Sequence, residues 1–286
     1  AYFYHGRSHQ FEADPTVTDY LIASRAAAEL AKQRKPAEAL AAYTALAAGK
    51  VTDFQKSDAL EHAAGYARGM GDFAQAGEIA TRIPIEAVRK TAQMQNLLAQ
   101  QKAPEVIARF GTDDIAAWPF WQIGEASFAR GRANAIAKRG SEAVSDFNRA
   151  IEFTGDLRAR QPIRVALGNA LEVLLHDDEA ALRAYRAVFD SPATLGSADE
   201  FGALQSAARI LTRQGKYDDA LATLRRADIA NMKGLWRGSL LLSVGDVQLA
   251  AGRKDEARAT YKTVADDPAM EPRILKLAKE KLAPER

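Results

Sequence analysis

The sequence contains no cysteine among its 286 residues. This absence excludes disulfide bonds, thiolate catalysis and cysteine-ligated metal centres, and it is compatible with a periplasmic or cell-envelope compartment. No apolar run approaches the ~20 residues that a membrane-spanning helix requires, so we expect no membrane span. Charge of one sign is not in excess either, because 39 basic and 37 acidic residues leave a formal net charge of +2. With no block of Lys and Arg, a nucleic-acid partner is not expected.

Signals of catalysis and cofactor binding are also scarce. The sequence has no glycine-rich phosphate loop in a strand context and no Gly-x-Ser-x-Gly elbow. His176 beside Asp177 is interpreted as part of a solvated turn. His5 and His9 could meet on a helix face as metal ligands do, but Gly6 weakens such a helix and no third ligand is evident. We therefore expect no enzyme activity, no catalytic residue, no cofactor and no metal.

Proline is rare, at 10 residues, whereas the helix formers Ala, Leu, Arg, Glu and Gln are abundant. An apolar content of 47% is enough for an extended core. Residues 1–17 differ from the rest, because Gly6, Ser8 and Pro15 interrupt any helical period there. The composition predicts an all-α protein that begins with a non-helical segment or linker at 1–17.

One phrase of the sequence recurs along the chain. The residues Gly215 to Ala220 are typical of a tight turn between two helices, because glycine can end a helix in the left-handed conformation and alanine lets the next helix approach closely. Similar phrases begin at Gly71 and Gly252. Such repetition predicts a helical repeat array, here at 18–270, followed by a capping helix at 271–286.

Small residues mark the period of this array. They recur at intervals of 37, 30, 37, 38, 39 and 37 residues, at Ala39, Ala76, Val106, Ala143, Ala181, Ala220 and Ala257. Four positions later the residue is aromatic in five cases, namely Tyr43, Phe110, Phe147, Tyr185 and Tyr261. A small residue permits close helix contact, and a ring one turn later fills the space toward the next pair. The spacing predicts about seven antiparallel helix pairs.

This pattern resembles the tetratricopeptide repeat (TPR) family, whose first helix carries a Leu-Gly and whose second helix carries an Ala–Phe/Tyr–Ala series. The best matches to this motif are Leu167-Gly168 and the set of Gly245, Ala257 and Tyr261. The likeness spans residues 19–270. The early Trp and the closing Pro of the motif are mostly missing, and the spacing exceeds 34 in all but one step. The resemblance implies a right-handed α-solenoid whose concave face binds peptides or proteins.

The resemblance also implies which side chains line that concave face. In the family, first-helix residues between the packing positions point into it. Carried onto this sequence, the peptide-binding groove consists of His62, Arg68, Gln95, Arg132, Asn169, Gln205, Arg209 and Asp246. Such mixed polar side chains suit a peptide with backbone amides and a carboxylate, although each one alone is also typical of a solvated surface.

A second candidate surface is aromatic. Trp118, Trp121 and Phe128 lie in one short stretch together with Arg130 and Arg132. Trp and Arg are common in binding hot spots, so this stretch is a candidate hot-spot cluster. The alternative is that these rings fill a poorly matched junction between helices.

Taken together, these patterns favour a non-catalytic scaffold that binds an unidentified protein or peptide partner. One alternative is the accessory repeat region of a longer, secreted enzyme whose catalytic domain precedes Ala1, because the chain begins without Met and with aromatic, non-helical residues. Another is a chaperone-like helper of the cell envelope. Self-association through exposed apolar ends is also compatible with the sequence.

Overall fold

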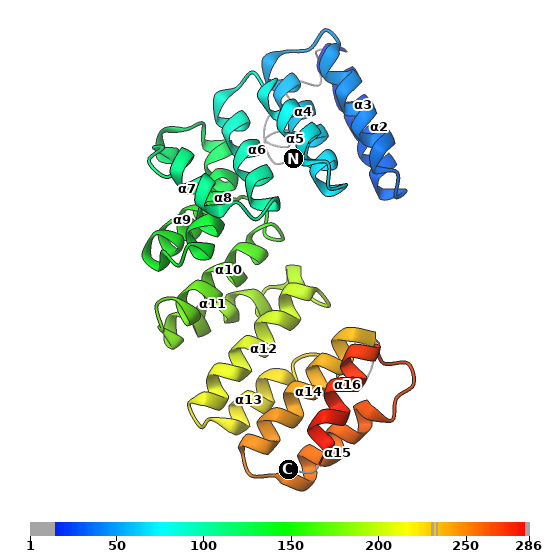
Figure 1. Ribbon diagram of the computed structural model, residues 1–286, viewed down its shortest axis with the longest axis vertical. Helices are drawn as coiled ribbons and strands as arrows, with labels where there is room; N and C mark the ends of the chain where they lie inside the picture. The colour runs from blue at the N-terminus through cyan, green and yellow to red at the C-terminus, as the bar shows by residue number, and fades with distance from the viewer. Residues whose placement is uncertain (1–14, 230–231, 233, 284–286) are drawn as a thin grey trace. The chain divides into compact units, whose positions relative to one another are not determined.

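A computed structural model describes residues 15–229, 232 and 234–283, and the side chains from residue 18 onward. Within these ranges every regular element is helical (Figure 1), which confirms the all-α prediction. The segment 1–14, with His5 and His9, lies outside the described residues. Helix α2 begins at Pro15, slightly earlier than the sequence pattern indicates, because proline is well tolerated in the first turn of a helix.

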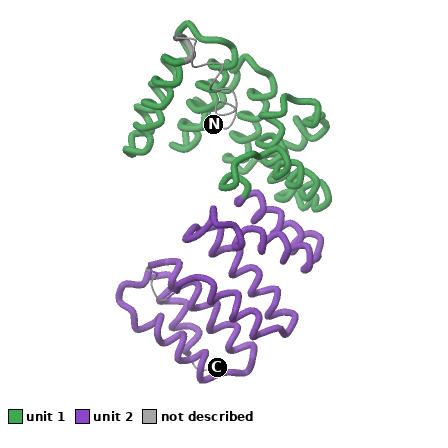
Figure 2. Tube along the Cα trace, turned by 180° about the vertical axis from the view of Figure 1, so that it is seen from behind, with its two compact units in different colours: residues 1–160 green, residues 161–286 purple. Residues whose placement is uncertain are grey.

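The chain forms two compact units, residues 1–160 and 161–286 (Figure 2). Unit 1 contains α2 (Pro15–Lys32), α3 (Pro36–Ala48), α4 (Asp53–Gly69), α5 (Phe73–Thr81), α6 (Glu86–Ala99), α7 (Ala103–Phe110), the short 3-10 helix η1 (Ile115–Ala117), α8 (Phe120–Ile136) and α9 (Gly140–Phe153). Unit 2 contains α10 (Arg160–Val173) apart from its first residue, α11 (Asp178–Phe189), η2 (Pro192–Thr194), α12 (Ala198–Arg213), α13 (Tyr217–Leu224), α14 (Gly234–Ala250), α15 (Lys254–Ala265) and α16 (Pro272–Leu282).

Successive helices pack as pairs, each with an even-numbered first helix and an odd-numbered second helix, as α2 and α3 show in Figure 1. Side chains help several of these helices to begin. Thr52 and Gln55 form a reciprocal capping box at the start of α4. Asp177 accepts a hydrogen bond from the backbone N–H of Ala180 at the start of α11, at 2.9 Å. The Asp177 cap lies in the turn of its pair, whereas the Thr52 cap begins the first helix of a pair.

The turn inside each pair contains one residue with a left-handed backbone. These residues are Arg34, Gly71, Gln101, Lys138, His176, Gly215 and Gly252. The next residue usually closes the turn by donating to a carbonyl five positions back, as Lys216 N–H does to Leu211 O at 2.9 Å. At His176 the turn is one residue longer, and Asp177 N–H donates to Leu171 O at 2.9 Å. Each left-handed residue precedes one of the small marker residues by five positions, so turn and packing position share one register.

The small marker residues are buried in the structure, and so are the residues four positions after them. The glycines of the Leu-Gly type motif lie against the aromatic rings that stand four positions after the small marker residues. A Cβ on Gly168 would stand 2.5 Å from Tyr185 Cε1, and one on Gly245 would stand 2.3 Å from Tyr261 Cε1. Gly131 meets Phe147 in the same way, at 2.8 Å. The motif residues therefore hold the helices of each pair together.

Hydropathy gives a separate result. Of the helices in the described part of the chain, none combines the length and the apolar character needed to cross a membrane.

Candidate functional site

The predicted groove residues Arg68 and Gln95 meet in unit 1, on neighbouring first helices. Arg68 Nη2 on α4 donates to Gln95 Oε1 on α6 at 2.8 Å, and Gln95 Nε2 donates to Glu125 Oε1 on α8 at 2.6 Å. We call Arg68, Gln95 and Glu125 the polar ladder. It joins three successive first helices through side chains alone. The sequence analysis missed Glu125, although it lies two helical turns before the predicted Arg132 and so shares its face.

Glu61 on α4 lies beside this ladder. Its Oε1 atom is buried, and the side chain of Gln122 on α8 acts as a hydrogen-bond donor that lowers the pKa of this carboxyl. Burial raises the pKa of Glu61 well above its ordinary value, and the carboxylates of Glu125 and Asp58 raise it further, against the opposing charge of Arg68. Sequence reasoning missed Glu61, because a glutamate on a helix is usually solvated.

Arg68 has unused hydrogen-bonding capacity of its own. Its Nη1 atom is buried and has no partner among the described residues. Burial lowers the pKa of Arg68, while the carboxylates of Glu125 and Glu61 act in the opposite direction and the charge of Arg132 lowers it further. Arg132 is itself exposed on α8, with its guanidinium 5.9 Å from the ring centre of Phe128. This face therefore combines opposite charges that are only partly paired.

His62, the next predicted groove residue, lies on the same helix as Glu61. Its ring stacks on Tyr43 with a centroid distance of 4.8 Å, and its Nε2 is 3.8 Å from Asp58 Oδ1. The hydroxyl of Tyr20 lies 2.5 Å from Asp58 Oδ2. Asp58 is thus held from two sides but stays partly exposed, and the sequence analysis did not select it.

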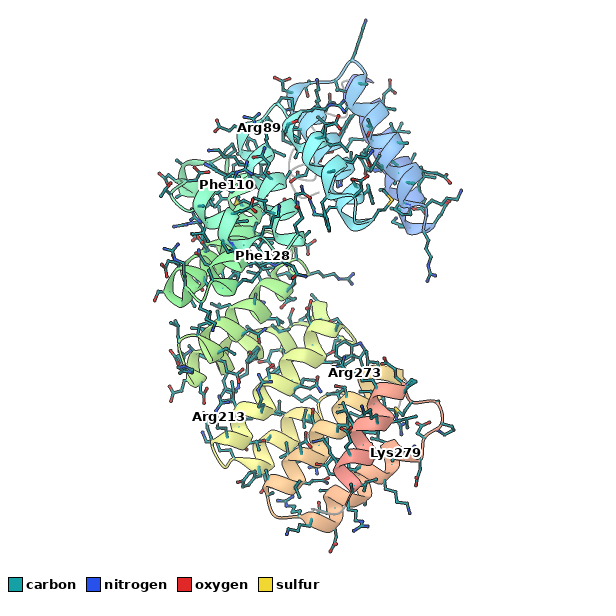
Figure 3. All side chains as sticks on the ribbon, viewed as in Figure 1. Arg89, Phe110, Phe128, Arg213, Arg273 and Lys279 are labelled. Carbon is teal, nitrogen blue, oxygen red and sulfur yellow. The ribbon has the colours of Figure 1, made fainter. Side chains whose placement is uncertain are left out.

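The three rings of the predicted hot-spot cluster do not form one group. Trp118 packs against the core of α6 to α8, with the ammonium of Lys90 5.8 Å from its ring centre. Phe128 on α8 (Figure 3) faces Phe147, at 6.0 Å between centroids. Trp121 instead contacts Phe54 of α4 edge-on at 5.9 Å. The Trp121–Phe54 contact, which joins two first helices, was not expected from the sequence.

Arg130, which the sequence analysis grouped with these rings, is a buried packing residue. Its Nε and Nη2 donate to the two carboxylate oxygens of Asp146, at 3.0 and 2.8 Å. Its Nη1 donates to the carbonyl of Asp113 at 2.7 Å. This bidentate pair ties α8 to α9 and leaves Arg130 without a free face for a partner.

In unit 2 the predicted groove residues bond to neighbouring helices. The Tyr185 hydroxyl donates to Asn169 Oδ1 at 2.7 Å. Arg209 on α12 pairs with Glu172 on α10 at 2.8 Å. Gln205 Nε2 donates to the hydroxyls of Ser239 and Ser243 on α14, at 2.8 and 2.9 Å. Asp246 accepts from Tyr261 at 2.7 Å and from Lys281 of α16 at 2.6 Å.

These bonds form a recurring connection in unit 2. The residue that follows the motif glycine accepts a hydrogen bond from the hydroxyl of the motif tyrosine. Asn169 accepts from Tyr185 in this way, and Asp246 accepts from Tyr261. Burial and the neighbouring carboxylate of Glu172 raise the pKa of Tyr185, so its hydroxyl stays a neutral donor. Arg213, at the end of α12 (Figure 3), pairs with Asp178 of α11 at 2.5 Å and so joins these two helices. Unit 2 thus uses these side chains to join its own helices.

Among the residues that the structure describes, no three His, Asp or Glu side chains are grouped so that they could hold a metal ion.

Comparison with known proteins gives structural matches only. No protein-family model and no curated protein matches the sequence. A tetratricopeptide repeat protein from Parabacteroides merdae is 13% identical, with 93% of this chain and 98% of that chain covered and a TM-score of 0.48. A kinesin light chain with nearly identical TPR-like repeats from Podosopora anserina is 13% identical, with 83% and 100% covered and a TM-score of 0.46. BtubC from P. vanneervenii is 14% identical, with 94% and 92% covered and a TM-score of 0.44.

The turns, the buried small residues and the glycine–ring contacts characterise this chain as a TPR-like helical repeat. The resemblance predicted from the sequence is therefore confirmed at the level of the fold.

Proposed function

We propose that this chain is a non-catalytic scaffold that binds a protein or peptide partner on the first helices of its helix pairs. One observation carries the proposal. Beside the polar ladder of unit 1, Arg68 Nη1 is buried without a hydrogen-bond partner among the described residues. Unsatisfied polar atoms of this kind are costly, and a bound chain with its own donors and acceptors offsets that cost.

The proposal assigns different roles to the two units. In unit 2 the groove residues Asn169, Gln205, Arg209 and Asp246 already bond to neighbouring helices. In unit 1, Arg132 and His62 are exposed next to groups that are incompletely paired. We therefore place the principal binding surface on α4, α6 and α8, with Arg132 as its most accessible charge.

Crosslinking pull-down from a lysate of the source organism, followed by mass spectrometry, tests this function. Arg132→Glu inverts an exposed charge on the proposed face, and we expect it to lose the partner that the wild-type chain captures. Arg109→Glu is the matched control, because Arg109 is exposed on the second helix α7. The proposal is wrong if both variants retain the same partners as the wild type.

A further inference from the structure

Three aromatic rings form a row at the end of unit 1 where α4 and α8 begin. Phe54 and Trp121 are each the second residue of their helix, and their rings meet edge-on at 5.9 Å between centroids. Phe120 continues the row, edge-on to Trp121 at 5.5 Å. Its side chain is 59% exposed. We call Phe54, Trp121 and Phe120 the aromatic row. An exposed ring that extends two packed rings gives unit 1 an apolar surface suited to further aromatic side chains.

Helix α2 begins beside this row. Tyr20 is the sixth residue of α2, and its hydroxyl donates to the backbone carbonyl of Gln55, the neighbour of Phe54, at 2.9 Å. Since Gln55 is the third residue of α4, both helices begin at the same end of unit 1. The helix between Pro15 and Tyr20 is only about 8 Å long. The backbone at Pro15 is therefore close to the aromatic row.

The sequence before Pro15 is rich in aromatic residues. Four of the residues in segment 1–14 are aromatic, namely Tyr2, Phe3, Tyr4 and Phe11. The whole chain is 8% aromatic, which corresponds to about one such residue in a segment of 14. At about 3.3 Å per residue, an extended chain from Pro15 reaches about 13 Å at Phe11 and about 36 Å at Tyr4. The segment is therefore long enough to place several rings on the aromatic row.

We propose that segment 1–14 binds in cis to the aromatic row, as an intramolecular ligand of unit 1. The inference goes beyond the proposed scaffold function and does not depend on it. Charge favours the same pairing, because Arg7 is the only Arg or Lys of the segment and Glu125 is exposed one helical turn after Trp121. A ligand joined to its site by a short linker has an effective concentration on the order of 1 mM, so modest contacts between rings are enough to keep it bound. A partner that binds where α4 and α8 begin must displace the segment.

The absence of cysteine allows a direct test on the full chain. Ser8→Cys introduces a single thiol into the segment, and this thiol is labelled with bimane, a fluorophore that tryptophan quenches only near contact. We expect the labelled protein to fluoresce about twofold less than the same protein with Trp121→Phe, because an effective concentration on the order of 1 mM keeps most segments bound. Trp236→Phe is the matched control, because it makes the same substitution in α14 of unit 2 and should leave the quenching unchanged.

Ring substitutions then test what holds the segment. Phe120→Ser should restore most of the lost fluorescence although Trp121 remains, whereas Phe153→Ser, which removes an exposed ring from the end of α9, should not. Circular dichroism establishes that each variant is folded. The inference is overturned if Trp121→Phe leaves the fluorescence unchanged, or if quenching persists in Phe120→Ser. Quenching that disappears when the protein is diluted would show binding to a second copy of the chain, which also contradicts binding in cis.

Discussion

Gly168 lies so close to Tyr185 that a Cβ at this position would stand 2.5 Å from Tyr185 Cε1. The ring is fully buried, and its hydroxyl is held by Asn169, the residue next to the glycine. The ring therefore cannot retreat without giving up a hydrogen bond. This pair fixes how closely α10 and α11 approach each other, and Gly245 with Tyr261 repeats it in α14 and α15.

Gly168→Ala is expected to destabilise the protein by about 1–3 kcal/mol, because the added methyl group overpacks this contact. Gly202→Ala is the control. Gly202 also lies within a helix, α12, but nothing stands within 4 Å of its added Cβ, so the higher helix propensity of alanine should stabilise the protein by up to about 1 kcal/mol. Urea unfolding monitored by circular dichroism measures both changes. Equal effects of the two substitutions would contradict the close-contact explanation.

The turn at Lys138 offers a prediction with the opposite sign. Lys138 has φ 60°, a left-handed conformation that costs about 1 kcal/mol or more for a residue with a Cβ. Lys138→Gly should stabilise the protein by about 0.5 kcal/mol, after allowance for the greater freedom of glycine in the unfolded chain. Gly215→Ala should destabilise it by about 1 kcal/mol, because Gly215 has φ 73° and open space around its Cβ position. Thermal unfolding measures the melting temperature of each variant. A shift of both melting temperatures in the same direction would contradict this account.

The buried pair of Arg130 and Asp146 gives a third prediction. Asp146→Ala leaves the Arg130 guanidinium buried without its bidentate partner, and a loss of about 3–5 kcal/mol is expected. The double variant Arg130→Met with Asp146→Ala removes the stranded charge as well and should lose less than Asp146→Ala alone. Chemical denaturation of the single and double variants forms a mutant cycle. Additive losses would show that the two groups do not act as a pair.

Glu61 makes the stability of unit 1 depend on pH. Its folded pKa is raised by burial and by Glu125 and Asp58, so the folded state holds the proton more tightly than the unfolded state. The resulting stabilisation is complete below the ordinary value of about 4.5 and is lost as the pH rises through the raised pKa. Glu61→Gln should therefore gain stability relative to wild type as the pH rises from about 5 to 8.

The groups that act on the pKa of Glu61 come from two helices: Asp58 and Arg68 on α4, and Glu125 and Gln122 on α8. Glu125→Gln removes one of the charges that raise the pKa of Glu61, so it should lower that pKa and flatten the pH dependence. Thermal unfolding across this pH range compares the three proteins. A constant difference between Glu61→Gln and wild type would rule out the proton linkage.

The repeat pattern was readable from the sequence because its signals are local. A small residue and a ring four positions later lie on one helix face whatever surrounds them, and both are buried as predicted. The turns at Gly71, Gly215 and Gly252 were recognisable, because glycine favours the left-handed backbone. At Arg34 and Gln101 the same conformation is adopted by residues that carry no such signal.

The candidate site was less predictable. Arg68 and Gln95 were correctly placed on first helices, and they meet across 27 positions of sequence. Glu61, Glu125 and Phe54 were missed, because nothing in the pattern of a single helix distinguishes a solvated glutamate from one that faces another carboxyl group. Whether Arg132 and the other groove residues bind a partner stays a prediction.

The sequence by itself determined that the chain is all-α, where its helices turn, and which small and aromatic residues pack, since helical period and backbone preference act over a few residues. Only the tertiary structure decided which polar side chains meet. It joined Arg209 to Glu172 in unit 2 and Arg68 to Gln95 in unit 1. The physical reason is distance along the chain. These contacts between first helices join residues 27 to 37 positions apart, and they depend on how whole helices pack.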